Sequence, residues 1–161
     1  MNVLHSLVLG TFLTFLTIAL QSLGTVWWIG RLRPNKKTQL DRVPNRLHSI
    51  KILCLSGCFL LLLHILQVTI WAIIYFFVVG KQEFSSFEEC CYFSAVTFTS
   101  LGFGDVVISS NWRLLSTVQA MVGLFVFGWS SALIFAIVQR MLAVEFIGSH
   151  PKPAYTRSMD T

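Results

Sequence analysis

Residues 97–105 read TFTSLGFGD. The short segment 86–98, which leads into this stretch and overlaps its first two residues, is predicted to be helical. Ser85-Ser86-Phe87-Glu88 matches a capping box, and Ser86 with Glu89 offers a second register for the same helix start. A helix of about 12 residues is only about 18 Å long, too short to cross a membrane. A short apolar helix followed by glycine-containing extended backbone predicts a re-entrant loop, because irregular backbone survives at membrane depth only where it lines a cavity.

Long apolar runs lie on both sides of this loop, at 1–30, 52–80 and 112–140. Each is long enough to cross the hydrocarbon core, which needs about 20 residues. A cleaved signal peptide is the alternative for the first run, but that run lacks a cationic start and a small-residue cleavage site. The expected fold is an all-α membrane protein with three transmembrane helices and a re-entrant helix and loop between the second and third.

The composition agrees with a membrane protein of little mass outside the bilayer. Of 161 residues, 55% are hydrophobic and 12% are charged, and the mean hydropathy is +0.71. Soluble domains carry about 25% charged residues. The spans also contain no Ser/His, paired-Asp or zinc-ligand arrangement, so we expect no enzyme activity.

The charge distribution predicts the topology. The segment 31–51 has seven basic residues and one acid, whereas 81–110 has one basic residue and four acids. The positive-inside rule therefore places 31–51 and the tail 141–161 in the cytoplasm, and the amino terminus and 81–110 outside. The basic segment either only sets this topology or also binds anionic lipid. We expect no nucleic-acid partner, since no soluble fold presents the basic residues.

Two groups of polar side chains in the second run have open roles. His64 and Gln67 share a helical face and should meet protein rather than lipid; His64 forms either an interhelical hydrogen bond or a proton-sensitive site. Cys54 and Cys58 lie four residues apart, which is typical of packing residues and less so of a metal site.

Residues 50–140 resemble the pore domain of the tetrameric potassium channels, whose selectivity filter is a Thr-Val-Gly-Tyr-Gly loop. The resemblance rests on TSLGFGD at 99–105, on the capped helix before it and on the span at each side. It implies an outer helix at 52–80, a pore helix at 86–98, a filter at 99–105 and an inner helix at 112–140. It also implies a homotetramer in the inner or plasma membrane, with the helix at 1–30 outside the minimal pore.

The resemblance further implies that backbone carbonyls bind the permeant ion, K⁺, without an organic cofactor. Carbonyl oxygens replace the ion's water shell, and Gly102 and Gly104 permit the positive φ that side chains disfavour. The carbonyls of Ser100, Leu101, Gly102 and Phe103 would be the K⁺ ligands, and the Ser100 hydroxyl would close the innermost site. The whole filter set is Thr99, Ser100, Leu101, Gly102, Phe103 and Gly104. Its expected supports are Asp105, Val96, Thr97, Tyr92 and Phe93.

The loop departs from the commonest family pattern at several positions. Ser100 replaces Thr, Leu101 replaces a β-branched residue, and Phe103 replaces Tyr, so no phenolic hydroxyl is available at 103. Val96 stands where some members place a carboxylate that pairs with the aspartate after the filter. Asp105 is expected to form an acidic ring, a hydrogen bond behind the filter, or neither.

The third run resembles the pore-lining inner helix. Gly123 and Gly128 fall where the family has a gating hinge and a second small residue; close packing against the second span is the alternative. A helical face with spacings of three and four residues is expected to line the cavity, with Phe135 as a hydrophobic gate. Its members are Leu124, Phe127, Ser131 and Phe135.

These features predict a potassium-selective channel. A nonselective monovalent cation channel and a nonconducting subunit of a larger channel or transporter complex are the alternatives.

Overall fold

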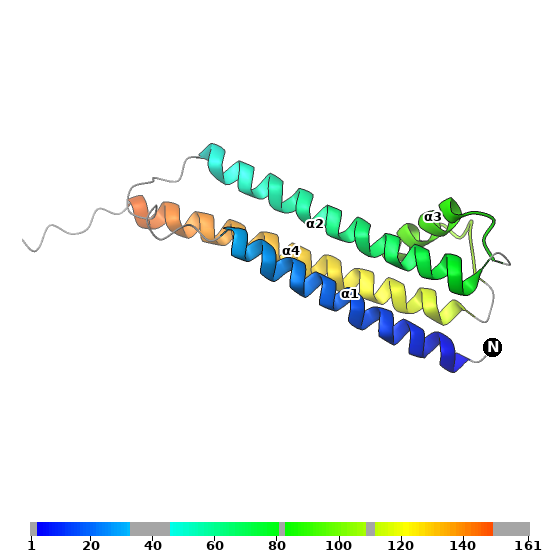
Figure 1. Cartoon of the computed structure of the whole chain (residues 1–161). Coiled ribbons are helices and arrows are strands. Elements are labelled where there is room, and N and C mark those ends of the chain that lie inside the picture. Colours follow the sequence, from blue (N-terminus) through cyan, green and yellow to red (C-terminus); the bar gives the residue numbers. More distant parts are fainter. Residues whose placement is uncertain (1–2, 33–45, 81–82, 109–111, 150–161) are drawn as a thin grey trace, which may run out of the picture.

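The computed structural model describes residues 3–32, 46–80, 83–108 and 112–149, and these are helical with short connections. Three long helices, α1 (Val3–Leu32), α2 (Arg46–Ile74) and α4 (Arg113–Ser149), run along one another. The π-helical turn η2 (Tyr75–Val79) extends α2, and the short helix α3 (Phe87–Phe98) lies between η2 and α4 in the chain. Figure 1 shows α3 and its loop at the end of the bundle where α1 begins.

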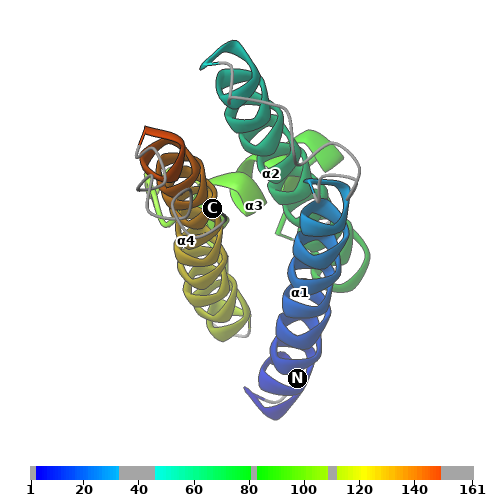
Figure 2. The ribbon, with the colours of Figure 1, turned by 90° about the vertical axis from the view of Figure 1, so that its left-hand side faces the viewer.

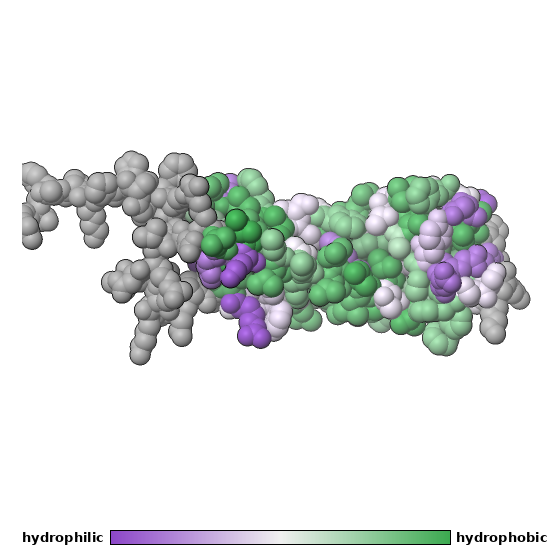
Figure 3. Space-filling model, turned by 90° about the horizontal axis from the view of Figure 1, so that it is seen from above, coloured by the Kyte–Doolittle hydropathy of each residue, from purple (hydrophilic) through white to green (hydrophobic). Residues whose placement is uncertain are grey.

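Three of the helices are long and apolar enough to cross a membrane, over Leu4–Leu32, Leu47–Val79 and Arg113–Ala143. Figure 3 shows hydrophobic side chains covering the middle of the molecule and hydrophilic ones gathering toward its two ends. The protein is therefore an all-helical membrane protein, and the fold class expected from the sequence is confirmed.

Two helices are longer than the sequence analysis expected. α2 begins at Arg46 instead of 52, and α4 continues to Ser149 instead of 140. The expected ends were placed where charged residues appear, but charge limits only the part of a helix that lipid can cover. Neither extension contains a proline that would stop the helix. Of the expected cytoplasmic segments 31–51 and 141–161, residues 33–45 and 150–161 lie outside the described residues.

The additional helix α1 packs against both α2 and α4, and the three occupy the corners of the bundle in Figure 2. Buried polar side chains join them. Gln21 Nε2 donates to Ser130 Oγ at 3.0 Å, and Gln67 Nε2 donates to Gln21 Oε1 at 3.1 Å. His64 Nε2 lies 2.9 Å from the same Ser130 Oγ. His64 therefore forms an interhelical hydrogen bond, one of the two roles that the sequence left open.

The helix α3 is held by an apolar core and by its cap. Tyr75 and Phe93 are buried and pack edge to face, with ring centroids 5.1 Å apart. At the start of α3, Ser86 Oγ accepts a hydrogen bond from the Glu89 backbone N–H at 3.2 Å, so the second capping register is the one formed. The Glu89 carboxylate accepts from the Ser85 N–H at 2.6 Å. The cap fixes where α3 begins, and the ring contact holds α3 against η2.

Candidate functional site

The carboxyl end of α3 turns directly into the loop 99–105. The Ser100 N–H donates to the Thr97 carbonyl and the Leu101 N–H to the Val96 carbonyl, each at 2.9 Å. This pair of bonds is a Schellman motif, which needs a left-handed residue just after the helix. Ser100 takes that conformation, with φ +57°. The sequence analysis assigned positive φ only to glycines and missed Ser100, because serine gives no local signal for this position.

Both loop glycines have the positive φ expected from the sequence, +54° at Gly102 and +82° at Gly104. A Cβ added to either would meet no atom within 4 Å. The requirement for glycine is therefore conformational, since space is available. In one subunit the whole segment 99–105 is exposed, including the apolar side chains of Leu101 and Phe103, which are 57% and 66% exposed.

Asp105 is braced by Tyr92 from α3. The Tyr92 hydroxyl donates to Asp105 Oδ2 at 2.6 Å, and the Val106 N–H donates to Oδ1 at 3.1 Å. The bond from Tyr92 lowers the pKa of Asp105, and the same bond raises the pKa of Tyr92. Of the roles considered for Asp105, the hydrogen bond is present. A phenolic hydroxyl thus reaches the loop from α3, although Phe103 has none.

The other expected supports also lie behind the loop. A pocket of about 280 Å³ separates α3 from the loop and the start of α4. Its lining includes Tyr92, Phe93, Val96, Thr97, Gly102, Gly104 and Asp105. The Ser100 hydroxyl, unlike these supports, lies on the side of the loop that faces α4. Its Oγ is 3.5 Å from the Ala120 carbonyl oxygen, the outer limit of a hydrogen bond.

At Gly123 the backbone of α4 lies against the backbone of α3. A Cβ there would lie 1.9 Å from the Phe98 carbonyl oxygen. At Gly128 a Cβ would meet nothing within 4 Å. The close packing considered for both glycines therefore applies to Gly123, and its partner is α3 instead of the second span. Gly128 is open in one subunit, so packing within the chain does not explain it.

The expected cavity face of α4 is divided. Leu124, Ser131 and Phe135 are exposed, whereas the half-buried Phe127 ring packs edge to face on His64 at 4.7 Å and on Phe98 at 5.8 Å. At 100° per residue, Phe127 lies about 60° round the helix from Leu124. This offset turns Phe127 toward α2 and α3 within the single chain, and the expectation that it lines a cavity stays a prediction.

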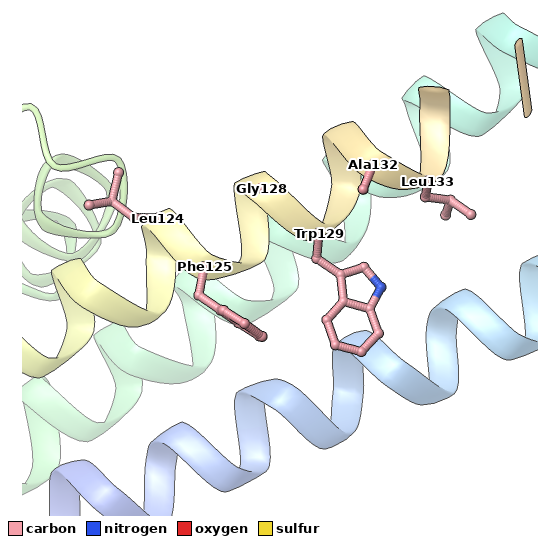
Figure 4. Close-up of a pocket in the computed structure, with 6 residues that line it drawn as sticks. All are labelled: Leu124, Phe125, Gly128, Trp129, Ala132 and Leu133. Atoms are coloured by element: carbon pink, nitrogen blue, oxygen red, sulfur yellow. The ribbon is translucent and has the colours of Figure 1, made fainter. Parts of the chain in front are cut away.

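Beside this face, α4 carries an open apolar groove of about 540 Å³. Figure 4 shows Phe125 and Trp129 extending from α4 toward α1, while Leu124 points to the other side. Gly128 and Ala132 carry no bulky side chain and leave the groove open between them. Leu124, an exposed member of the expected cavity face, is also one of the residues that line this groove.

Two further groups of polar side chains were open or overlooked in the sequence. No three His, Cys, Asp or Glu side chains in the described ranges gather as metal ligands. Cys54 and Cys58 are exposed free thiols, so they do not pack inside the single chain as the sequence analysis expected. The sequence analysis overlooked Gln119 and Gln21, both fully buried. A polar amide inside an apolar run was the available signal.

Comparison with known proteins gives one match. A family model described as "Ion channel" (Ion_trans_2) matches residues 59–140, which is half of the chain. The matched region covers most of α2, all of α3 and the loop, and α4 up to Arg140, but leaves out α1. No curated protein and no solved structure matches the chain.

Proposed function

The chain belongs to this ion-channel family, with a small pore domain of the potassium-channel type at 59–140, and on that premise we propose that it conducts K⁺ passively through a pore enclosed by four identical copies. The conformation of the loop after α3 carries the proposal. Positive φ at Gly102 and Gly104 lets neighbouring carbonyls face one side, and stacked carbonyls can replace the hydration shell of K⁺. The proposed ligands are the carbonyls of Ser100, Leu101, Gly102 and Phe103.

The helix α3 adds an electrostatic term. The carboxyl end of a helix carries a partial charge of about −0.5, and α3 ends at Phe98, directly before the loop. Four such ends around one axis would favour a cation without the fixed charge that would trap it. Within the family, α3 thus supports cation conduction in preference to anion conduction.

The exposed apolar surface supports assembly. Channels of this family assemble into oligomeric pores, and one chain supplies a single strand of carbonyls. Leu101 and Phe103 are more than half exposed in one subunit, and the groove on α4 is open and apolar. Lipid can cover the apolar side chains of a span, but Leu101 and Phe103 belong to the irregular loop, which at membrane depth has to be covered by protein, and other copies are proposed to supply that cover.

A nonselective monovalent cation channel is the second candidate. It is favoured by Ser100, which stands where the family commonly has Thr and takes a left-handed conformation with its hydroxyl toward α4. A hydroxyl turned away from the pore axis would leave the innermost ion site with fewer oxygens. Discrimination between K⁺ and Na⁺ would then fall, while conduction remained.

The proposed topology places the amino terminus and the α3 end outside the cell. These two parts lie at the same end of the bundle (Figure 1), as the two spans between them, α1 and α2, require. The segment 31–51 is proposed to lie in the cytoplasm, near anionic lipid. With the four native cysteines replaced by serine, labelling of His5→Cys and of Glu88→Cys should occur only from outside in intact cells; labelling from the cytoplasm would reverse the topology.

The function is tested by ion flux from liposomes that contain the purified protein. We expect K⁺ efflux from the wild type, a strong loss with Gly102→Ala and with Gly104→Ala, and wild-type efflux with the control Gly57→Ala, which lies on an exposed face of α2. Absence of efflux, together with a mass below that of a tetramer, would point to the nonconducting subunit. Equal K⁺ and Na⁺ flux would select the nonselective channel.

A further inference from the structure

One fully buried polar side chain of α4 contacts both neighbouring helices of the pore domain. Gln119 has no exposed surface and lies one turn before Gly123 in the membrane-spanning part of α4. A polar side chain inside a span is costly unless it is hydrogen-bonded, and it commonly serves a specific purpose. Its partners therefore indicate its role.

All the strong bonds of the Gln119 amide cross to other helices. Nε2 donates to the Ser94 carbonyl at 3.2 Å and to Ser94 Oγ at 2.8 Å, both in α3. Oε1 accepts from the Tyr75 hydroxyl at 2.7 Å. Ser94 Oγ in turn donates to the Val68 carbonyl of α2 at 2.8 Å. A carbonyl can only accept, so the contact to the Ser94 carbonyl fixes which end of the amide faces α3.

Gln119 and Gly123 define the position of α3 along α4. They lie four residues apart on one face of α4, and their partners Ser94 and Phe98 lie four residues apart on one face of α3. One turn is joined by amide hydrogen bonds, and the next by the close approach of Gly123 to the Phe98 carbonyl. Two contacts one turn apart prevent both sliding and tilting. A displacement that lengthened the 2.8 Å bond by about 1 Å would break it.

We infer that Gln119 is a positioning residue that sets the height and tilt of α3 on α4, and through α3 the geometry of the ion-binding carbonyls. The inference rests on the proposed function, because those carbonyls begin two residues after α3 ends. Gln119 itself touches no ion. Its effect passes from Ser94 through the last turn of α3 to the Schellman motif at Ser100.

The test compares Gln119→Leu with Gln21→Leu. Gln21 is equally buried, but it bonds to Ser130 and Gln67 and has no contact with α3. Both variants remove one buried amide and should lower thermal stability similarly. Only Gln119→Leu should speed amide hydrogen exchange in residues 94–101 and lower the K⁺/Na⁺ permeability ratio in planar bilayers, by about tenfold.

The weaker variant Tyr75→Phe keeps both bonds to Ser94 and should shift exchange and ratio in the same direction by less; it carries the test if Gln119→Leu does not assemble. Exchange in 94–101 that is unchanged, or equally raised by Gln21→Leu, overturns the inference. The inference is also overturned if the wild type is selective for K⁺ and Gln119→Leu speeds exchange in 94–101 without changing the K⁺/Na⁺ permeability ratio. If the wild type conducts nothing, or conducts K⁺ and Na⁺ alike, the proposed selectivity fails, and faster exchange specific to Gln119→Leu still supports the positioning of α3.

Discussion

Gly123→Ala tests the close approach of α4 to α3. The new Cβ would lie 1.9 Å from the carbonyl oxygen of Phe98 and 2.8 Å from the carbonyl carbon of the same residue. The shortest C···O contacts in proteins are about 3.3 Å, so the two helices would have to separate by about 1.4 Å. Both contact atoms belong to backbone, and a change of side-chain rotamer cannot relieve the clash.

The expected cost follows from two opposing terms. Alanine gains about 1 kcal/mol over glycine inside a helix, whereas overpacking costs about 1–3 kcal/mol. Gly57→Ala, where a Cβ meets nothing within 4 Å, gains the first term only. The difference between the two variants therefore isolates the packing cost. We expect the free energy of unfolding of Gly123→Ala to be about 1–3 kcal/mol lower than that of Gly57→Ala.

The assay is unfolding of the purified variants in detergent, followed by helical circular dichroism, together with K⁺ flux from liposomes. Gly123→Ala should unfold more easily than Gly57→Ala and lose flux, because the displacement reaches the end of α3. If the two variants are equally stable and Gly123→Ala keeps wild-type flux, α3 and α4 are not in backbone contact at this point and the reasoning is refuted.

Three further outcomes are expected. Tyr92→Phe removes the bond that lowers the Asp105 pKa. Ionised Asp105 stabilises the fold above its unfolded pKa, and this stabilisation is lost as pH falls through its folded pKa, so in the variant the loss should occur at a higher pH. An unchanged acid midpoint of unfolding would contradict this. Ser86→Ala removes the cap of α3 and should cost about 1 kcal/mol in detergent unfolding, where Ser85→Ala, which keeps its backbone donor, should cost little. Ser130→Ala removes the acceptor that Gln21 uses and should lower stability by about 0.6–1.7 kcal/mol while leaving hydrogen exchange in α3 unchanged.

Features encoded by neighbouring residues could be predicted from the sequence. The cap of α3 needs only Ser86 and Glu89, three residues apart, and the positive φ of Gly102 and Gly104 follows from the lack of a side chain. The three spans follow from uninterrupted apolar runs, although their ends do not, because a helix continues past the membrane wherever its backbone allows.

Features decided by distant contacts could not. Gln21 and Ser130 are separated by 109 residues and Gln119 and Ser94 by 25, so the sequence shows a polar side chain without its partner. The spacing of Phe127 is compatible with the open face, and only the position of α3 turns its ring inward. Ser100 is left-handed because the loop must leave α3 there, a demand that serine itself does not reveal.

The Schellman motif at Ser100 has a consequence for biogenesis. Its two bonds join residues that are three and five positions apart in the chain, so closing them costs little loop entropy and needs no second copy. On the proposed assembly, a newly inserted monomer therefore bends Ser100, the first residue of the proposed carbonyl strand, into place before it meets another copy. Association then has less backbone freedom to remove, and it is left to order the strand from Leu101 onward.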